Sequence, residues 1–230
     1  MNKKTTKAIV LKRLDYGDSD RIITVLTPDY GKLTLIAKGV RKIKSKLAGG
    51  IELFAVFDAG FIVGRGEVGR LISARLDEFY GNIINDIKRV QLGYEILRIF
   101  DRSLENDVEN SYFYLLCQLL RLLNEESIPL TIIELYYKSK LLVIAGHTPN
   151  LITDESGKKL LDGERYSFSV TSMTMSPSSS GRLSPSHIKL LRLLFAQGDN
   201  QQVFKVNLSN HEDEVLLPIV DAMFRAYLSV

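Results

Sequence analysis

The 230-residue sequence contains one cysteine, and this scarcity excludes several kinds of protein. A single thiol can form neither an internal disulfide nor a cysteine pair for a metal. Cys117 lies among leucines at helical spacing, which favours a buried structural thiol over a nucleophile. No apolar run approaches the roughly 20 residues of a membrane span, and no signal-peptide core follows the first lysines. We therefore expect a soluble cytoplasmic protein with no membrane contact.

Catalytic and metal-binding motifs are also scarce. The three histidines, His147, His187 and His211, fall at predicted helix ends, and none is four residues from another or from the cysteine. This spacing does not suit a metal site. The sequence has no Walker-type phosphate loop and no Gly-x-Ser-x-Gly elbow. We expect no enzyme activity, no catalytic residue and no cofactor.

Charge is distributed unevenly along the chain. The net charge is +3, but residues 1–50 hold 12 lysines and arginines against 4 aspartates and glutamates. Residues 51–230 hold 18 against 23. A basic segment on an otherwise slightly acidic chain indicates contact with a polyanion. The alternative is a lysine-rich surface that only solvates the protein.

Short β-strands are predicted within the first 80 residues. Apolar and β-branched residues separated by turn residues indicate five strands, at residues 7–14, 21–27, 32–38, 51–63 and 67–78. Five short strands suggest a small closed or sandwich β domain, and the OB-type barrel is the commonest nucleic-acid-binding member of that class. Residues 39–50 carry cations between glycines and predict an exposed loop.

Helical periodicity begins after Tyr80. It predicts helices at residues 83–100 and 108–123, and a third that Ser127 caps and Gly146 ends. Residues 148–183 are rich in Thr, Ser, Gly and Asp, and helices return at Ser184-Pro185 and after Ser209, with Pro218 kinking the last helix or marking its start. The predicted fold is α+β, with a β-barrel domain at 1–79 and a mainly helical domain at 80–230.

The basic segment supplies the candidate binding residues. Its cations suit phosphate neutralisation, and flexible ammonium groups favour contact with a nucleic-acid backbone over base readout. These candidates are Lys38, Arg41, Lys42, Lys44 and Lys46 in the loop region, with Arg13 and Arg21 on nearby strands. Tyr16 and Tyr30 are either stacking platforms or half-buried barrel residues, and the second interpretation is favoured.

At these residues the chain resembles the RecO family of bacterial recombination mediators. The resemblance lies in the sequences IVLK (9–12), YGDSDRI (16–22), TPDYGKL (27–33), AKGVRK (37–42) and KSKL (44–47). Further along, residues 137–142 with Gly146, Pro149 and Leu151 follow the family's Gly-x-x-Pro-x-Leu step.

The resemblance implies an N-terminal OB-fold and a helical C-terminal domain. It also implies binding of single- and double-stranded DNA, annealing of complementary strands, and loading of RecA onto single strands coated by single-strand-binding protein. The implied partners in this RecFOR pathway of DNA damage repair are RecR and the C-terminal tail of single-strand-binding protein, and the implied place is the nucleoid. The implied DNA contacts are Lys38, Arg41, Lys42, Lys44 and Lys46.

One departure concerns zinc. Many relatives carry a four-cysteine zinc ribbon after the Pro-x-Leu step, and the corresponding positions here are Asp154, Gly157, Ser176 and Ser179. Since no thiolate remains, we expect no structural zinc and a metal-free hairpin within residues 148–183. Two functional alternatives stay open: a protein-interaction adaptor built on an OB-type domain, and an RNA-binding protein without annealing activity.

Overall fold

The computed structural model describes residues 3–63, 68–104, 109–198, 201–206 and 210–228, with the side chains of 210–213 left out. The chain divides into two compact units, Met1–Glu126 and Ser127–Val230. The barrel strands end at Phe79, inside the first unit. Whether residues 1–79 fold independently of the rest of the first unit is not tested by this division, so the predicted domain boundary at residue 79 stays a prediction.

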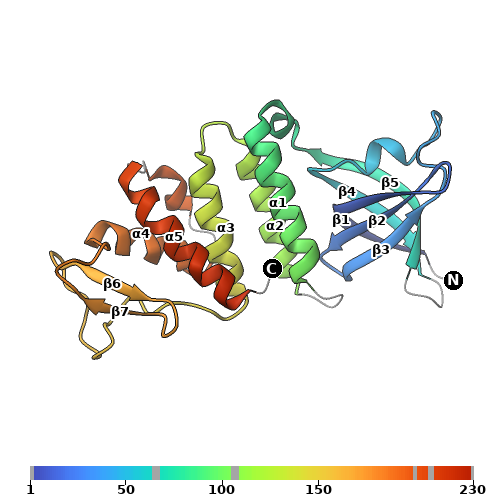
Figure 1. Ribbon diagram of the computed structural model, residues 1–230. Coiled ribbons are helices and arrows are strands. Elements are labelled where there is room, and N and C mark those ends of the chain that lie inside the picture. Colours follow the sequence, from blue (N-terminus) through green and yellow to red (C-terminus); the bar gives the residue numbers. More distant parts are fainter. Residues whose placement is uncertain (1–2, 64–67, 105–108, 199–200, 207–209, 229–230) are drawn as a thin grey trace. The chain divides into compact units, whose positions relative to one another are not determined.

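Five strands of the first unit close into a barrel (Figure 1). They are β1 (Lys3–Tyr16), β2 (Asp20–Thr27), β3 (Gly31–Ala37), β4 (Ala55–Ile62) and β5 (Val68–Phe79). The order around the barrel is β1-β2-β3-β5-β4, with β3 and β5 parallel and the other pairs antiparallel. The five-stranded architecture predicted from the sequence is confirmed. The fourth strand begins at Ala55, so the predicted start at Ile51 is wrong, and a short 3-10 helix at Ala48–Gly50 precedes it.

The barrel is apolar on the inside and partly apolar on the outside. Ala8, Val10, Ile23, Val25 and Leu35 belong to the interior core. On the opposite face, Ile9 pairs with Leu26, and both side chains are completely buried. Two helices explain this burial, because α1 (Ile87–Ser103) packs on β1 and α2 (Asn110–Asn124) packs on β2. The first unit is therefore a barrel with two helices on its outer surface.

The two helices carry specific terminal contacts. A 3-10 turn, Gly81–Asn85, precedes α1, so the α-helix starts four residues later than the predicted residue 83. Asp86 caps α1 by accepting from the backbone N–H groups of Lys88 and Arg89. The buried Arg89 guanidinium donates to the carbonyls of Leu123 and Glu126, both at 2.9 Å, at the C-terminal end of α2.

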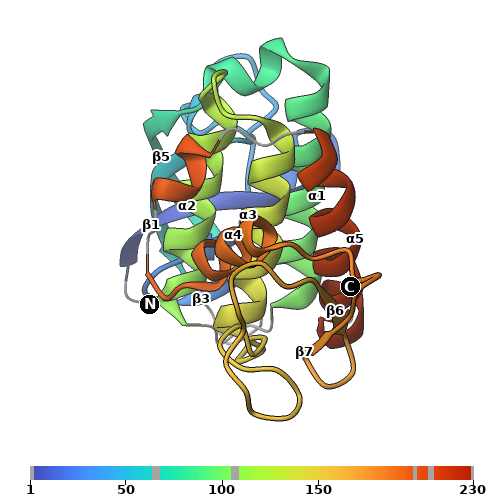
Figure 2. The same ribbon diagram turned by 90° about the vertical axis from the view of Figure 1, so that its left-hand side faces the viewer.

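The second unit contains three helices and a hairpin. The helices α3 (Leu130–Ile144), α4 (Pro185–Phe195) and α5 (Asn210–Tyr227) pack on one another, with a 3-10 turn at Gln201–Lys205. Strands β6 (Tyr166–Ser169) and β7 (Thr174–Pro177) pair in the 148–183 region, beside the C-terminal part of α5 (Figure 2). There the Tyr227 hydroxyl donates to the carbonyl of Val170 at 2.9 Å. The predicted α+β class is confirmed.

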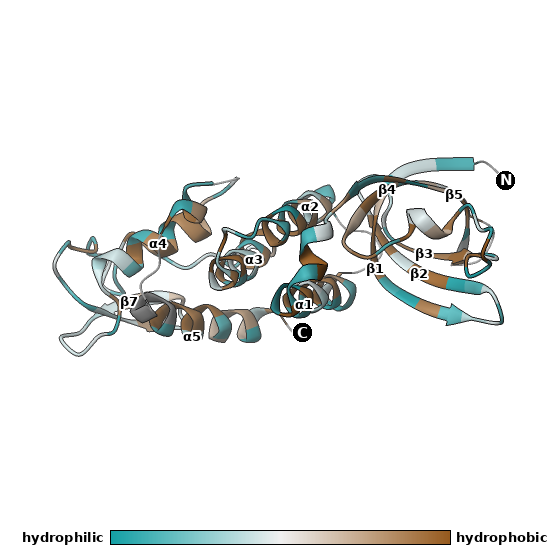
Figure 3. Ribbon diagram, turned by 90° about the horizontal axis from the view of Figure 1, so that it is seen from above, coloured by the Kyte–Doolittle hydropathy of each residue, from teal (hydrophilic) through white to brown (hydrophobic). Residues whose placement is uncertain are grey.

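Some helix ends differ from the sequence prediction. The N-cap residue of α3 is Pro129, not the predicted Ser127, and its side chain gives no capping hydrogen bond. Proline suits the start of a helix because it has no N–H group to leave unsatisfied. Ser184 caps α4 as predicted, with Pro185 at the first position. Helix α5 runs through Pro218. Hydrophobic residues, brown in Figure 3, occur on strands and helices alike, yet no helix in the described part of the chain is long and apolar enough to cross a bilayer.

Candidate nucleic-acid interface

Residues 38–50, which we call the basic loop, are anchored by the barrel core. Val40 and Ile51 belong to that core, with exposed fractions of 3% and 1%, and Leu47 packs against it. Gly50 backs onto β5 so closely that a Cβ there would lie 2.6 Å from the Ala74 carbonyl oxygen. A glycine is therefore required where the loop rejoins the barrel. Apolar side chains therefore fix the loop to the barrel core, and its cations lie on the outer surface.

Hydrogen bonds hold the beginning of the basic loop to the β1–β2 turn. The Gly39 N–H donates to the Asp20 carboxylate at 2.7 Å, and the Arg41 N–H donates to the Ser19 carbonyl at 2.9 Å. Within the loop, the Ser45 N–H donates to the Lys42 carbonyl at 2.9 Å. The predicted exposure of the loop is confirmed, and the fold places it against the turn that carries the YGDSD sequence.

The four candidate lysines of this region are exposed and have no ion-pair partner among the described residues. They are Lys38, Lys42, Lys44 and Lys46. Unpaired ammonium groups on a surface loop are available for phosphate oxygens without first breaking an internal contact. The lysines therefore form the accessible part of the candidate interface.

The three candidate arginines are engaged by carboxylates. Arg21 donates to Asp15 at 2.8 Å, and the Arg41 guanidinium lies 3.6 Å from the other oxygen of the same carboxylate. The hydrogen bond from Arg21 lowers the pKa of Asp15, and the charge of Arg41 lowers it further. Arg13 contacts Glu52 at 3.2 Å. The structure thus brings Arg21 and Arg41 together at Asp15, while Arg13 lies where the chain leaves the loop.

The two tyrosines weighed as stacking platforms differ. Tyr30 packs edge-on against Phe61 with ring centroids 5.4 Å apart, and the Lys4 ammonium lies 4.5 Å from its ring centre. Tyr30 is thus a packed barrel residue, as the favoured interpretation predicted. Tyr16 is 54% exposed at the end of β1.

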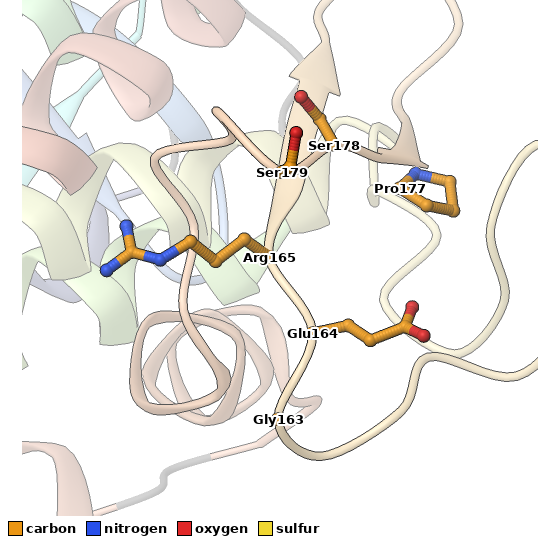
Figure 4. Close-up of a pocket in the computed structure, with 6 residues that line it drawn as sticks. All are labelled: Gly163, Glu164, Arg165, Pro177, Ser178 and Ser179. Carbon is orange, nitrogen blue, oxygen red and sulfur yellow. The ribbon is translucent and has the colours of Figure 1, made fainter.

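Two surface hollows that described residues line lie outside the basic loop. One, in the second unit, is lined by Gly163, Glu164, Arg165, Pro177, Ser178 and Ser179. Its two charged side chains point away from each other (Figure 4), and these six residues include no histidine or cysteine to form a nucleophile–base pair. The other is a groove between β1 and α1 in the first unit. Sequence analysis did not identify the α1 residues of this groove, although Tyr94, Arg98 and Arg102 recur at intervals of four.

Comparison with known proteins identifies the family. A family described as "Recombination protein O N terminal" matches residues 1–79, and "Recombination protein O C terminal" matches residues 84–230. The chain belongs to the RecO family. A relative from Roseiflexus sp. (strain RS-1), named DNA repair protein RecO, is 34% identical over 84% of this chain and 70% of its own length. The proteins of the same name from Halalkalibacterium halodurans and Alkaliphilus metalliredigens are each 30% identical, and the matches span 57% and 59% of their lengths.

The zinc-ribbon positions of this RecO chain do not suit zinc. The Asp154 carboxylate accepts from the Ser156 N–H, the Ser156 hydroxyl and the Lys158 N–H at 2.7 to 3.0 Å. These hydrogen bonds, led by the Ser156 hydroxyl, lower the pKa of Asp154. Gly157 has no side chain that could bind a metal, and Ser176 and Ser179 carry hydroxyls in place of thiolates. In the described part of the chain, no three His, Cys, Asp or Glu residues come together as a metal site requires. Hydrogen bonds to Asp154 therefore stabilise the turn at residues 154–158, where the zinc-ribbon relatives would bind a zinc ion.

The remaining reactive side chains have structural roles. Cys117 is buried, and burial raises the pKa of its thiol to about 11. His187, at the third position of α4, is 5% exposed and its Nδ1 accepts from the Ser184 N–H at 3.0 Å. His147 lies against the Tyr227 ring, with centroids 4.8 Å apart. The side chain of His211 lies outside the described residues.

Proposed function

We propose that this RecO chain is a recombination mediator in DNA repair. It binds single- and double-stranded DNA through the basic loop, anneals complementary strands and helps load RecA onto single strands coated by single-strand-binding protein. RecR and the C-terminal tail of single-strand-binding protein are the proposed partners, and the nucleoid is the proposed location. The proposal assigns the protein no covalent chemistry and no cofactor. The relatives, all named DNA repair protein RecO, support the repair role.

The observation that carries the proposal is the separation of roles within the basic loop. Val40 and Ile51 hold the loop in the barrel core, whereas four lysines project without ion pairs to described residues. A polyanion that binds such a surface gains Coulomb energy and releases counterions. Lysine is a point charge on a flexible stem, so the contact follows phosphates and reads little sequence. Tolerance of sequence is what annealing of arbitrary complementary strands requires.

The test is binding of a fluorescent single-stranded oligonucleotide across a salt series, with annealing of its complement followed in the same sample. Four lysine–phosphate contacts predict a slope of log K against log salt of about −3, at roughly −0.7 per phosphate. Faster annealing than the oligonucleotides show alone supports the mediator. Absence of binding at low salt would overturn the proposal in favour of a protein-interaction adaptor. Preference for RNA over DNA of the same sequence would overturn it in favour of an RNA-binding protein.

A further inference from the structure

A groove of about 540 Å³ runs between β1 and α1 of the first unit, outside the basic loop. Its volume falls within the roughly 300–1,000 Å³ of small-molecule sites. Leu11 and Leu53 give it an apolar floor, and Tyr94 gives it an aromatic wall. The remaining lining residues are charged: Lys12, Arg13, Arg98, Arg102 and Asp101. Four cations and one carboxylate therefore line the groove, and one of the cations, Arg13, is also paired with Glu52.

The floor of the groove includes a β-bulge on β1. The pairing of β1 with β2 shifts register between Val10 and Lys12, so that Leu11 is an extra residue in the strand. At this bulge Val10 belongs to the barrel core, whereas Leu11, 5% exposed, lines the groove. Lys12, the next residue, is exposed at the rim. Val10 and Leu11 are thus both buried, Val10 by the barrel core and Leu11 beside α1.

A strained residue positions the aromatic wall. Phe54 has a φ of 56°, a left-handed conformation that is uncommon for a bulky residue. Its ring packs over Gly93, where a Cβ would lie 2.7 Å from the ring, and it meets Tyr94 edge-on with centroids 5.5 Å apart. Tyr94 nevertheless remains 51% exposed. Strain of this kind costs about 1–3 kcal/mol and concentrates at functional sites. Here the strained residue packs edge-on against a partly exposed aromatic ring that lies beside cations.

The α1 side of the groove presents a regular row of side chains. Tyr94, Arg98 and Arg102 are four residues apart, so they lie on one face of the helix. Neither arginine forms an ion pair with a residue in the described ranges. An exposed ring followed by guanidinium groups along one face matches the combination that binds single-stranded nucleic acid, in which bases stack and phosphates are neutralised.

The groove adjoins the basic loop through Arg13. The Arg13 guanidinium lines the groove, and it donates to the carbonyl of Ile51, the residue that directly follows the loop, at 3.4 Å. We propose that the groove holds one or two nucleotides of a single strand, with a base against Tyr94 and phosphates at Arg98 and Arg102. This inference rests on the proposed function and extends it, since a strand bound by the loop lysines continues past Arg13 into the groove.

The first test is photo-crosslinking of the full chain to an oligonucleotide that contains 5-iodouridine, with the attachment sites mapped by mass spectrometry. Attachment to Tyr94 supports the groove. Binding with attachment only to residues of the basic loop would refute it while leaving the proposed function intact. Absence of DNA binding at low salt would remove both.

The second test uses matched variants in the same binding assay. Tyr94→Ser should weaken single-strand binding by roughly 5- to 150-fold, the range found when one stacking aromatic is lost, whereas Tyr94→Phe should bind as the unaltered chain does. The pair Arg98→Gln and Arg102→Gln should reduce the salt slope by about 1.4. Lys158→Gln with Lys159→Gln makes the same charge change in the second unit and should leave the slope unchanged.

These variants also separate nucleic acid from an acidic protein partner. Equal slopes for the groove pair and the Lys158/Lys159 pair would refute the groove as a DNA site even if Tyr94→Ser misfolds. A labelled poly-glutamate peptide serves as the acidic probe. If the Arg98→Gln and Arg102→Gln pair loses binding to this peptide but keeps its DNA binding, the groove is assigned to an acidic partner and the proposal is overturned.

Discussion

Arg41 and Asp15 lie 3.6 Å apart, guanidinium to carboxylate, and the same carboxylate accepts a hydrogen bond from Arg21. One acidic residue thus restrains two of the candidate DNA-binding arginines. Asp15 comes from β1, Arg21 from β2 and Arg41 from the basic loop, so the contact forms only when the barrel is assembled. It also places a negative charge beside the surface proposed to bind phosphates.

Asp15→Asn should therefore tighten DNA binding. The substitution removes one repulsive charge and releases Arg21 and Arg41, and we expect a gain of a few-fold in affinity because exposed charges interact weakly in water. Oligonucleotide affinity at low salt is the measurement. Asp162→Asn, in the second unit, makes the same charge change and should have no comparable effect. Unchanged affinity in Asp15→Asn would show that neither arginine reaches the DNA.

Combined substitution of Arg41, Lys42 and Lys44 by alanine should weaken DNA binding without loss of stability. Loss of Lys42 and Lys44 removes two of the four lysine–phosphate contacts and should reduce the salt slope by about 1.4, and a phosphate contact by Arg41 would bring the reduction to about 2. The thermal midpoint should stay within a degree or two, because these side chains are exposed and surface substitutions change stability by less than about 0.5 kcal/mol. Val40→Ser, inside the core, should instead lower the midpoint by several degrees. Full DNA affinity in the triple variant would disprove the loop assignment.

The local pattern of the sequence was enough to predict the strands, the main helices and the exposure of the basic loop. The β-branched run from Arg21 to Thr27 is recognised from neighbouring residues alone, and β2 extends this range by one residue. The predicted strand start at Ile51 was wrong because Ile51 and Phe54 are buried by packing on the core and on α1, not by pairing. Apolar character alone does not distinguish these two forms of burial.

The candidate site was only partly predictable. Charge counted along the chain identified the loop cations, which lie within nine residues of sequence, from Lys38 to Lys46. Neither the pairing of Asp15 with Arg41 nor the meeting of Lys12 with Arg98 follows from local sequence, since each joins segments far apart in the chain. The bulge at Leu11 and the φ of Phe54 likewise depend on tertiary packing, which overrides local preference.

Gly93→Ala tests the packing that positions Tyr94. Alanine favours a helix by about 1 kcal/mol over glycine, so propensity alone predicts stabilisation. The new Cβ would lie 2.7 Å from the Phe54 ring, which is already held at a positive φ, and overpacking costs about 1–3 kcal/mol. We expect a net loss in urea unfolding. Adding Phe54→Leu should recover part of the loss by removing the ring atoms that clash. A more stable Gly93→Ala chain would contradict the tight packing.

Lys138 on α3 tests how the second unit is held together. Its ammonium is bound by Glu134 on the same helix and by Asp221 on α5, and its side chain is 8% exposed. Burial lowers the pKa of Lys138, but the hydrogen bonds to Asp221 and Glu134 outweigh burial, so the pKa lies above its ordinary value of 10.5. A raised lysine pKa means that the folded state holds this proton more tightly than the unfolded chain does.

Lys138→Met should therefore destabilise the protein in a pH-dependent way. Removing the ammonium leaves two carboxylates facing each other, and we expect a loss of about 2 kcal/mol, less than the roughly 3–5 kcal/mol of a fully buried pair because both carboxylates keep contact with water. The stabilisation by Lys138 is complete below pH 10.5 and is lost as the pH rises through the raised pKa. The free energy of unfolding in urea should therefore differ between the unaltered protein and Lys138→Met by an amount that is constant near neutral pH and shrinks above about pH 10.5. Asp221→Asn, which keeps Glu134, should lose less. A difference between the two chains that persists unchanged at pH 11.5 would mean that Lys138 stabilises the unit through its alkyl chain and not through its charge.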